Sequence, residues 1–261
     1  MNLVVERFDG LRRAGRKALI TYMMGGDPGL KESAKLLDML SEAGADFIEV
    51  GAPFSDPLAD GPVIQSAGQR ALRNGCTLEK LLAALKPAVR NVDAPVILMI
   101  YYNMIFQRGA ARFVDECLES GVAGLIVPDL LPEDAGELWR LADGSGIGLN
   151  FLVAPTSSEA RIDGAAEAST GFLYAVSLKG VTGVRSQLPA DLPEFIRKVR
   201  SRTHKPVAVG FGIGSPEQAR RVAEIADGAI VGSAVVQAAF DDPGFEKVTQ
   251  LVRGFKAAIT A

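Results

Sequence analysis

The acidic side chain of Glu49 stands inside an otherwise apolar segment, Phe-Ile-Glu-Val-Gly at residues 47–51. A carboxylate rarely lies in such a segment without a partner or a function, because burying its charge is costly. Glu49 shares its parity with Phe47 and Gly51, so a strand places all three on one face. In apolar surroundings Glu49 would have a raised pKa and act as a general acid or base. The alternative is a structural acid held in a salt bridge.

Two more acids, Asp56 and Asp60, lie in the loop that follows, which reads Ala-Pro-Phe-Ser-Asp-Pro-Leu-Ala-Asp-Gly-Pro at residues 52–62. Its prolines indicate a loop that holds one shape. An acid fixed there beside Glu49 would complete a catalytic constellation. The alternative is a turn capped by aspartate, and for Asp56 this is the interpretation that we favour.

Two glycine clusters each follow a predicted strand and open a predicted helix. They are Gly-Phe-Gly-Ile-Gly at residues 210–214 and Gly232-Ser233. Backbone N–H groups at such helix starts bind phosphate, and barrel enzymes use the loops after strands 7 and 8 in this way. A single cluster could be a plain turn. Two clusters in these positions predict a phosphorylated substrate.

A long segment at residues 178–188 follows the sixth predicted strand and contains Gly180 and Gly183 as possible hinges. Its length favours a lid that closes over substrate and excludes water, the alternative being a surface loop. Tyr22 and Tyr174 would bring hydroxyl groups to the same end of the strands, although either can also be a core residue.

Eight short segments rich in β-forming apolar residues must position these groups. They cover residues 19–24, 47–51, 96–102, 124–127, 148–153, 172–177, 207–212 and 228–232. They are apolar on both faces, as in parallel strands covered on both sides. Helical periodicity recurs between them, at residues 30–43, 78–89, 110–120, 132–143, 158–168, 192–201 and 216–226.

Eight alternating units without an evident linker predict a (β/α)8 TIM barrel with a single domain over residues 1–261. A doubly wound open sheet is the alternative. A helix at residues 1–14 would plug the N-terminal end of the barrel. A short extra helix at residues 233–240 follows strand 8, and a final helix covers residues 245–259.

The composition excludes several classes of function. Lys and Arg number 28 and Asp and Glu 31, a net charge of −3 that favours neither nucleic acid nor membrane as a partner. His204 is the sole histidine, and Cys76 and Cys117 stand far apart, so a Cys/His zinc site is not expected. Two isolated cysteines, with no apparent signal peptide and no membrane-spanning run, predict a cytoplasmic protein.

The segment at residues 47–62 closely resembles the signature of the tryptophan synthase α subunit family. Further blocks resemble the family in the same order: Gly-Asp-Pro-Gly at 26–29, Tyr-Tyr-Asn at 101–103, Pro-Asp at 128–129, Gly-Val-Thr-Gly at 180–183, Gly-Phe-Gly-Ile at 210–213 and Gly-Ser-Ala at 232–234. The chain departs from the pattern at Tyr22, where we expect Phe, and in a shorter stretch after Gly183.

The resemblance implies a retro-aldol cleavage of indole-3-glycerol phosphate to indole and glyceraldehyde 3-phosphate, with Glu49 and Asp60 as the catalytic pair. It also implies two sets of substrate contacts. The indole and its chain would lie near Tyr22, Met99, Ile126, Tyr174 and Thr182, and the phosphate near Gly183, Gly212, Gly232 and Ser233. No metal or cofactor is implied in this chain.

The resemblance also implies a partner, the tryptophan synthase β subunit with its pyridoxal phosphate, in an α2β2 assembly. Apolar residues in the loops after strands 2, 3 and 4 would form the docking patch, the alternative being that they fold inward and line the pocket. They are Pro53, Phe54, Pro57, Leu58, Met104, Ile105, Phe106, Leu130, Leu131 and Pro132. Two other functions stay open: a sugar-phosphate isomerase or epimerase, and a catalytically silent regulatory subunit.

Overall fold

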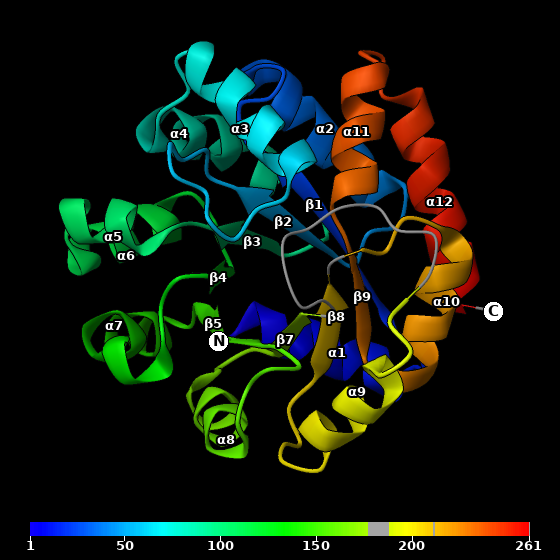
Figure 1. Ribbon diagram of the computed structural model, residues 1–261. Helices are drawn as coiled ribbons and strands as arrows, with labels where there is room; N and C mark the ends of the chain where they lie inside the picture. Colours follow the sequence, from blue (N-terminus) through cyan, green and yellow to red (C-terminus); the bar gives the residue numbers. More distant parts are fainter. Residues whose placement is uncertain (177–187, 211, 261) are drawn as a thin grey trace.

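The parallel strands of the computed structural model close into a barrel (Figure 1). The model describes residues 1–176, 188–210 and 212–260. Along the sheet the order is β5-β4-β3-β2-β1-β9-β8-β7-β6. Because Phe151 alone separates β5 from β6 in the chain, the two ends of this order meet. The strands are β1 (Ala18–Met24), β2 (Phe47–Gly51), β3 (Val96–Met99), β4 (Gly124–Ile126), β5 (Gly148–Asn150), β6 (Leu152–Val153), β7 (Leu173–Val176), β8 (Val207–Gly210) and β9 (Gly228–Val231).

Helices surround the ring of strands (Figure 1). They are α1 (Leu3–Arg13), α2 (Leu30–Glu42), α3 (Pro62–Arg73), α4 (Leu78–Val89), α5 (Tyr102–Arg108), α6 (Ala110–Glu119), α7 (Gly136–Ser145), α8 (Glu159–Ala168), α9 (Leu192–Arg200), α10 (Pro216–Ile225), α11 (Ser233–Asp241) and α12 (Glu246–Thr260). The predicted barrel is therefore confirmed, and the open sheet is wrong. No helix in the described part of the chain is long and apolar enough to span a membrane.

Three segments differ from the sequence-based expectations. Residues 62–73 form α3, which was not predicted, and Pro62 occupies its first turn, where proline is tolerated. The third strand ends at Met99 instead of residue 102, since α5 begins at Tyr102. The helix predicted at residues 132–143 begins as a 3-10 turn over Pro132–Asp134 before α7.

The side chain of Asn150 closes the barrel between β5 and β7. Its Oδ1 accepts from the N–H of Phe172 at 2.8 Å, and its Nδ2 donates to the carbonyls of Leu125 at 3.0 Å and Gly148 at 3.1 Å. Beyond it the N–H of Tyr174 donates to the carbonyl of Phe151 at 3.0 Å, and pairing continues through β6. The predicted fifth strand thus splits in two because a side chain replaces part of the backbone ladder.

Helix α1 plugs the N-terminal end of the barrel, as predicted. Asn2 caps it by accepting from the N–H groups of Val4 and Val5 at 3.1 and 3.2 Å. Phe8 points into the barrel, with its ring centroid 4.7 Å from that of Phe47 and 5.4 Å from that of Phe172. These aromatic rings close the N-terminal end of the barrel, so a reaction must take place at the C-terminal end of the strands.

Candidate active site

Glu49 lies in β2 on the face that points into the barrel, together with Phe47, which meets the plug helix. It is paired in register with Tyr22 of β1 and Ile97 of β3. Its side chain is 1% exposed, and Oε2 has no hydrogen-bond partner within the described residues. Burial, reinforced by the nearby charge of Asp60, raises the pKa of Glu49 to about 8. The carboxyl group therefore holds a proton at neutral pH.

Asp60 closes the loop between β2 and α3 and is also buried. Its N–H donates to the carbonyl of Pro57 at 3.1 Å, and its own carbonyl accepts from Gln65 Nε2 at 2.9 Å. Burial raises the pKa of Asp60 to about 6, and the nearby Tyr101 hydroxyl acts in the opposite direction. Asp60 is therefore mostly ionised at pH 7, beside a protonated Glu49.

Tyr22 and Tyr174 bring their hydroxyls to the same region from β1 and β7. A Cβ atom on Gly51 would lie 2.0 Å from the Tyr22 hydroxyl, and one on Gly210 would lie 2.4 Å from the Tyr174 hydroxyl. Each ring thus packs over a glycine of the next strand, where any side chain would collide with it. Burial and the charges of both acids raise the pKa of each tyrosine.

Met99 and Ile126 form an apolar wall next to the acids. The two are paired in register at the C-terminal ends of β3 and β4, and Met99 also pairs with Gly51. Both side chains are buried. The structure therefore brings together six of the predicted residues: Tyr22, Glu49, Asp60, Met99, Ile126 and Tyr174.

The predicted phosphate residues lie after β8 and β9. Gly212 has a φ of 83°, a backbone conformation that favours glycine, and Ser233 is the first residue of α11. Gly232 precedes α11 and lies against Tyr22, whose Cβ would be 3.5 Å from a Cβ at position 232. Thr182, Gly183 and the predicted lid over residues 178–187 lie outside the described residues.

Tyr101 is a site residue that the sequence-based selection missed. It follows β3, and its hydroxyl accepts from the N–H of Ala59 at 3.1 Å and lies near the Asp60 carboxylate, whose pKa it lowers. The available signal was weak, namely a tyrosine at the end of an apolar run, within residues 101–103 of the resembling blocks.

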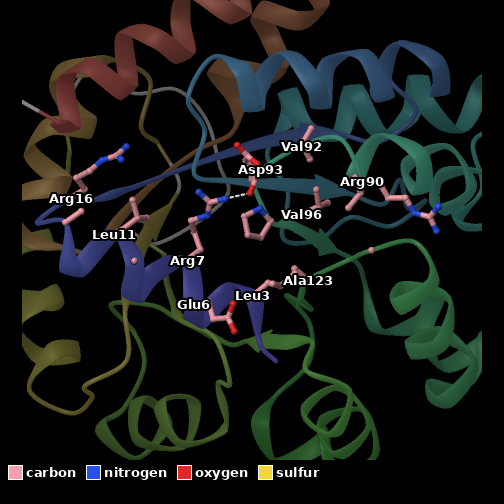
Figure 2. Close-up of a pocket in the computed structure, with 16 residues that line it drawn as sticks. Leu3, Glu6, Arg7, Leu11, Arg16, Arg90, Val92, Asp93, Val96 and Ala123 are labelled. Atoms are coloured by element: carbon pink, nitrogen blue, oxygen red, sulfur yellow. Dashed lines mark hydrogen bonds between the residues drawn. The ribbon is translucent and has the colours of Figure 1, made fainter.

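A hollow of about 600 Å³ lies at the other end of the barrel, between α1 and the segment leading into β3 (Figure 2). Leu11 and Val96 contribute apolar lining, and Arg7 donates to the main-chain carbonyl of Asp93. The carboxylates on its rim, Glu6 and Asp93, are exposed. Because it holds no buried pair of acids, this hollow is not the candidate active site. In the described part of the chain no three His, Cys, Asp or Glu side chains gather as a metal site.

Comparison with known families agrees with this geometry. A family model described as "Tryptophan synthase alpha chain" matches residues 8–258. The chain belongs to the tryptophan synthase alpha chain family. The resemblance recognised in residues 47–62 is thereby confirmed, and the isomerase or epimerase alternative is not.

Individual relatives cover the whole chain. The tryptophan synthase alpha chain of Geotalea daltonii is 45% identical over 264 residues, covering 100% of both chains. That of Trichormus variabilis is 47% identical over 263 residues, covering 99% of each. A solved structure of Mycobacterium tuberculosis tryptophan synthase superimposes with a TM-score of 0.92 at 37% identity, covering 99% of this chain and 98% of that chain.

Proposed function

We propose that this chain cleaves indole-3-glycerol phosphate to indole and glyceraldehyde 3-phosphate, with Glu49 and Asp60 as the catalytic residues. The observation that carries the proposal is the pair itself. A carboxyl group with a pKa of about 8 lies beside one with a pKa of about 6 at one end of the barrel. Two acids whose pKa values are pushed apart suit opposite roles, proton donor and charge stabiliser.

The reaction breaks the bond between indole C3 and the glycerol phosphate chain. Glu49 donates its proton to C3, which makes the ring an indolenine able to accept the bonding electrons. The Glu49 carboxylate then removes the proton from the hydroxyl of the adjoining carbon as the bond breaks and the aldehyde forms. One proton is given and one is taken, so Glu49 ends as it began. These steps use side chains alone.

Asp60 stabilises the charge that the first step creates. Protonation at C3 places positive charge on the ring nitrogen, and an ionised carboxylate beside that N–H lowers the energy of the transition state. Met99 and Ile126 provide apolar contact for the ring, with Tyr22 and Tyr174 around it. Gly212 in the loop after β8, together with Gly232 and Ser233 at the start of α11, binds the phosphate through backbone N–H groups. We assign Thr182 and Gly183 to substrate and phosphate binding from the family pattern.

Membership of this family also indicates a partner protein. We propose that a tryptophan synthase β subunit, which carries pyridoxal phosphate, docks on the loops around the active site in an α2β2 assembly. Two exposed apolar side chains support the proposal: Leu58 of the Asp60 loop is 88% exposed and Phe106 of α5, which follows β3, is 72% exposed. Pro53, Ile105 and Leu130 were expected in the patch but are buried and cannot form its surface. We place the assembly in the cytoplasm.

Indole release tests the proposed function directly. The purified full-length chain is mixed with indole-3-glycerol phosphate, with and without the β subunit, and both indole and glyceraldehyde 3-phosphate are measured. We expect slow cleavage by the chain alone and faster cleavage with the partner. No product under either condition would leave a silent regulatory subunit as the better description.

A further inference from the structure

Tyr101 contacts the loop that carries Asp60 at three points. Its hydroxyl accepts from the N–H of Ala59 at 3.1 Å and lies near the Asp60 carboxylate, whose pKa it lowers. Its ring stacks on Phe54, with the centroids 5.1 Å apart and the planes at 24°. One side chain thus holds both the beginning and the end of residues 54–60.

The backbone around Tyr101 is well anchored. The N–H of Ile100 donates to the carbonyl of Ile126 in β4 at 3.0 Å, and the carbonyl of Tyr101 accepts from the N–H of Met104 at 3.1 Å. The next N–H, of Tyr102, donates to Asp129 Oδ1 at 2.8 Å. Tyr101 is itself buried. It therefore belongs to the rigid barrel rather than to the loop.

The loop has little support of its own towards solvent. Ser55, Asp56 and Leu58 are exposed. Its internal hydrogen bonds are short-range, such as Leu58 N–H to the Asp56 carbonyl at 2.9 Å. Gln65 of α3 donates to the main-chain carbonyls of Pro57 and Asp60, but these bonds leave the Asp60 side chain free to turn. The carboxylate therefore needs a further partner to keep one orientation.

We propose that Tyr101 is the positioning residue for Asp60, holding its carboxylate towards the ring nitrogen of the substrate through the phenolic hydroxyl. The inference rests on the proposed function, since the task of Asp60 is part of it. Tyr101 acts through Asp60 and not on the reacting atoms.

The hydroxyl also keeps Asp60 charged. Asp60 is faced by Glu49 from β2, Tyr22 from β1, Tyr174 from β7 and Tyr101 from the end of β3. Among these groups, the Tyr101 hydroxyl is the one that lowers the pKa of Asp60 against the effect of burial. Removing it raises that pKa further, so a smaller fraction of Asp60 is ionised at a given pH. When the pH is lowered, activity that needs the carboxylate must then begin to fall at a higher pH than in the wild type.

The test compares Tyr101→Phe with Tyr102→Phe, its neighbour in sequence. Tyr101→Phe keeps the ring and its stack on Phe54 but removes the hydroxyl. Tyr102→Phe is the matched control, because the ring contact of Tyr102 is with Phe106 and not with the Asp60 loop. Cleavage of indole-3-glycerol phosphate is followed from about pH 5 to about pH 9, with kcat and KM separated, and thermal unfolding checks the fold.

For Tyr101→Phe we expect kcat at neutral pH to fall about three- to tenfold, the range for a lost hydrogen bond between neutral groups. KM should change less, since Asp60 acts mainly in the transition state. The acidic limb of the pH profile should move to higher pH, so that alkaline pH recovers part of the loss. Tyr102→Phe should match the wild type.

Two results would overturn the inference while the wild type cleaves its substrate. One is an unchanged kcat and pH profile in Tyr101→Phe. The other is a loss of equal size at every pH that follows a loss of thermal stability, as expected of a packing residue. Absence of cleavage by the wild type itself would instead count against the proposed function, so the two failures are distinguishable.

Discussion

At the scale of single residues, the molecule keeps Glu49 neutral and Asp60 charged although both are buried acids of one site. The difference arises first from burial and then from neighbouring groups. Glu49 is the more deeply buried of the two, has an oxygen without a hydrogen bond and is close to the charge of Asp60. The pKa of Asp60, in contrast, is lowered by the nearby Tyr101 hydroxyl. Each protonation state suits the role that we propose for that residue.

Replacing Glu49 by glutamine should abolish steady-state indole formation, with a loss of at least about 10²- to 10⁴-fold, because the amide neither donates nor takes the proton. The substrate analogue glycerol 3-phosphate should still bind. The exposed acid Glu42 offers a control, and Glu42→Gln should retain full activity. Substantial indole formation by Glu49→Gln would refute the assignment.

The raised pKa of Glu49 also predicts that the stability of the wild type depends on pH in a way that Glu49→Gln does not share. The pKa of Glu49 is raised from 4.5 to about 8, so the folded protein binds this proton more tightly than the unfolded chain. Its contribution to stability is fully present below about pH 4.5 and is lost as the pH rises to about 8. Glu49→Gln lacks this titration and should gain on the wild type by a few kcal/mol across that window. If the urea midpoints of Glu49→Gln and the wild type differed by the same amount at every pH, the result would contradict a raised pKa of Glu49.

Asp60→Asn should lower kcat severely and ligand affinity only slightly. The charge of Asp60 matters most when positive charge develops on the ring, and binding of the ground state needs it less. Asp56→Asn is the control in the same loop, because Asp56 is exposed. Steady-state kinetics with calorimetry of glycerol 3-phosphate binding separate the two effects, and equal losses in both quantities would speak against the assignment.

At the scale of elements, the strand ends are shaped so that large rings fit over glycines. Tyr22 packs over Gly51 of β2 and Tyr174 over Gly210 of β8, and in both pairs the glycine lies two residues beyond the register partner of the tyrosine. The same local arrangement, used on two pairs of neighbouring strands, brings two hydroxyls to one end of the barrel.

Gly51→Ala should therefore displace the Tyr22 ring, since the new Cβ would lie 2.0 Å from its hydroxyl. We expect a loss of stability of about 1–3 kcal/mol and reduced cleavage. Adding Tyr22→Phe removes the nearest clashing atom and should recover part of both. Gly68→Ala in α3 is the control, because its Cβ would meet Met24 at an ordinary 3.5 Å. Urea unfolding and kcat/KM measure the effects, and a neutral Gly51→Ala would show that the ring is free to move.

At the scale of the whole molecule, the barrel depends on the joint between β5 and β7, where Asn150 replaces backbone pairing. Asn150→Ala leaves the N–H of Phe172 and the carbonyl of Leu125 without this partner. Buried groups left unpaired in this way should cost roughly 2–4 kcal/mol. The exposed Asn91 provides the matched control, Asn91→Ala.

We propose that residues 1–261 form one domain, and the Asn150 variant tests this as well. Because the strands share one closed sheet, loss of the joint should lower the midpoint of a single unfolding transition followed by circular dichroism. A separate early transition would indicate that part of the barrel unfolds independently.

The docking surface also belongs to this scale, because Leu58 comes from the Asp60 loop and Phe106 from α5. Leu58→Arg or Phe106→Arg should weaken binding of the β subunit and leave basal cleavage nearly intact. Leu118→Arg is the control, since Leu118 is 44% exposed on α6, away from these loops. Sedimentation and the indole assay measure assembly and activation. Unchanged assembly in both variants would place the partner elsewhere.

Local patterns in the sequence predicted the barrel and six of the residues that lie together in the candidate site. Apolar segments alternating with helical periodicity are a local property, so they predicted the barrel without any distant contact. The parity of Glu49 with Phe47 and Gly51 fixed its direction for the same reason. Helices α3 and α5 were not predicted, because the prolines before and at the start of α3 and the aromatic residues of α5 fit both a loop and a helix start.

Which side chains of the candidate site contact one another follows only from the tertiary structure. Tyr101 and Ala59 are 42 positions apart, and no local pattern shows that one hydroxyl joins the β3 end to the Asp60 loop. The exposure of Leu58 and the burial of Pro53, nearby in one loop, likewise follow from how that loop folds over the barrel. The raised pKa values of the two acids depend on burial and on charges from several strands, so these shifts arise only once the sheet has closed.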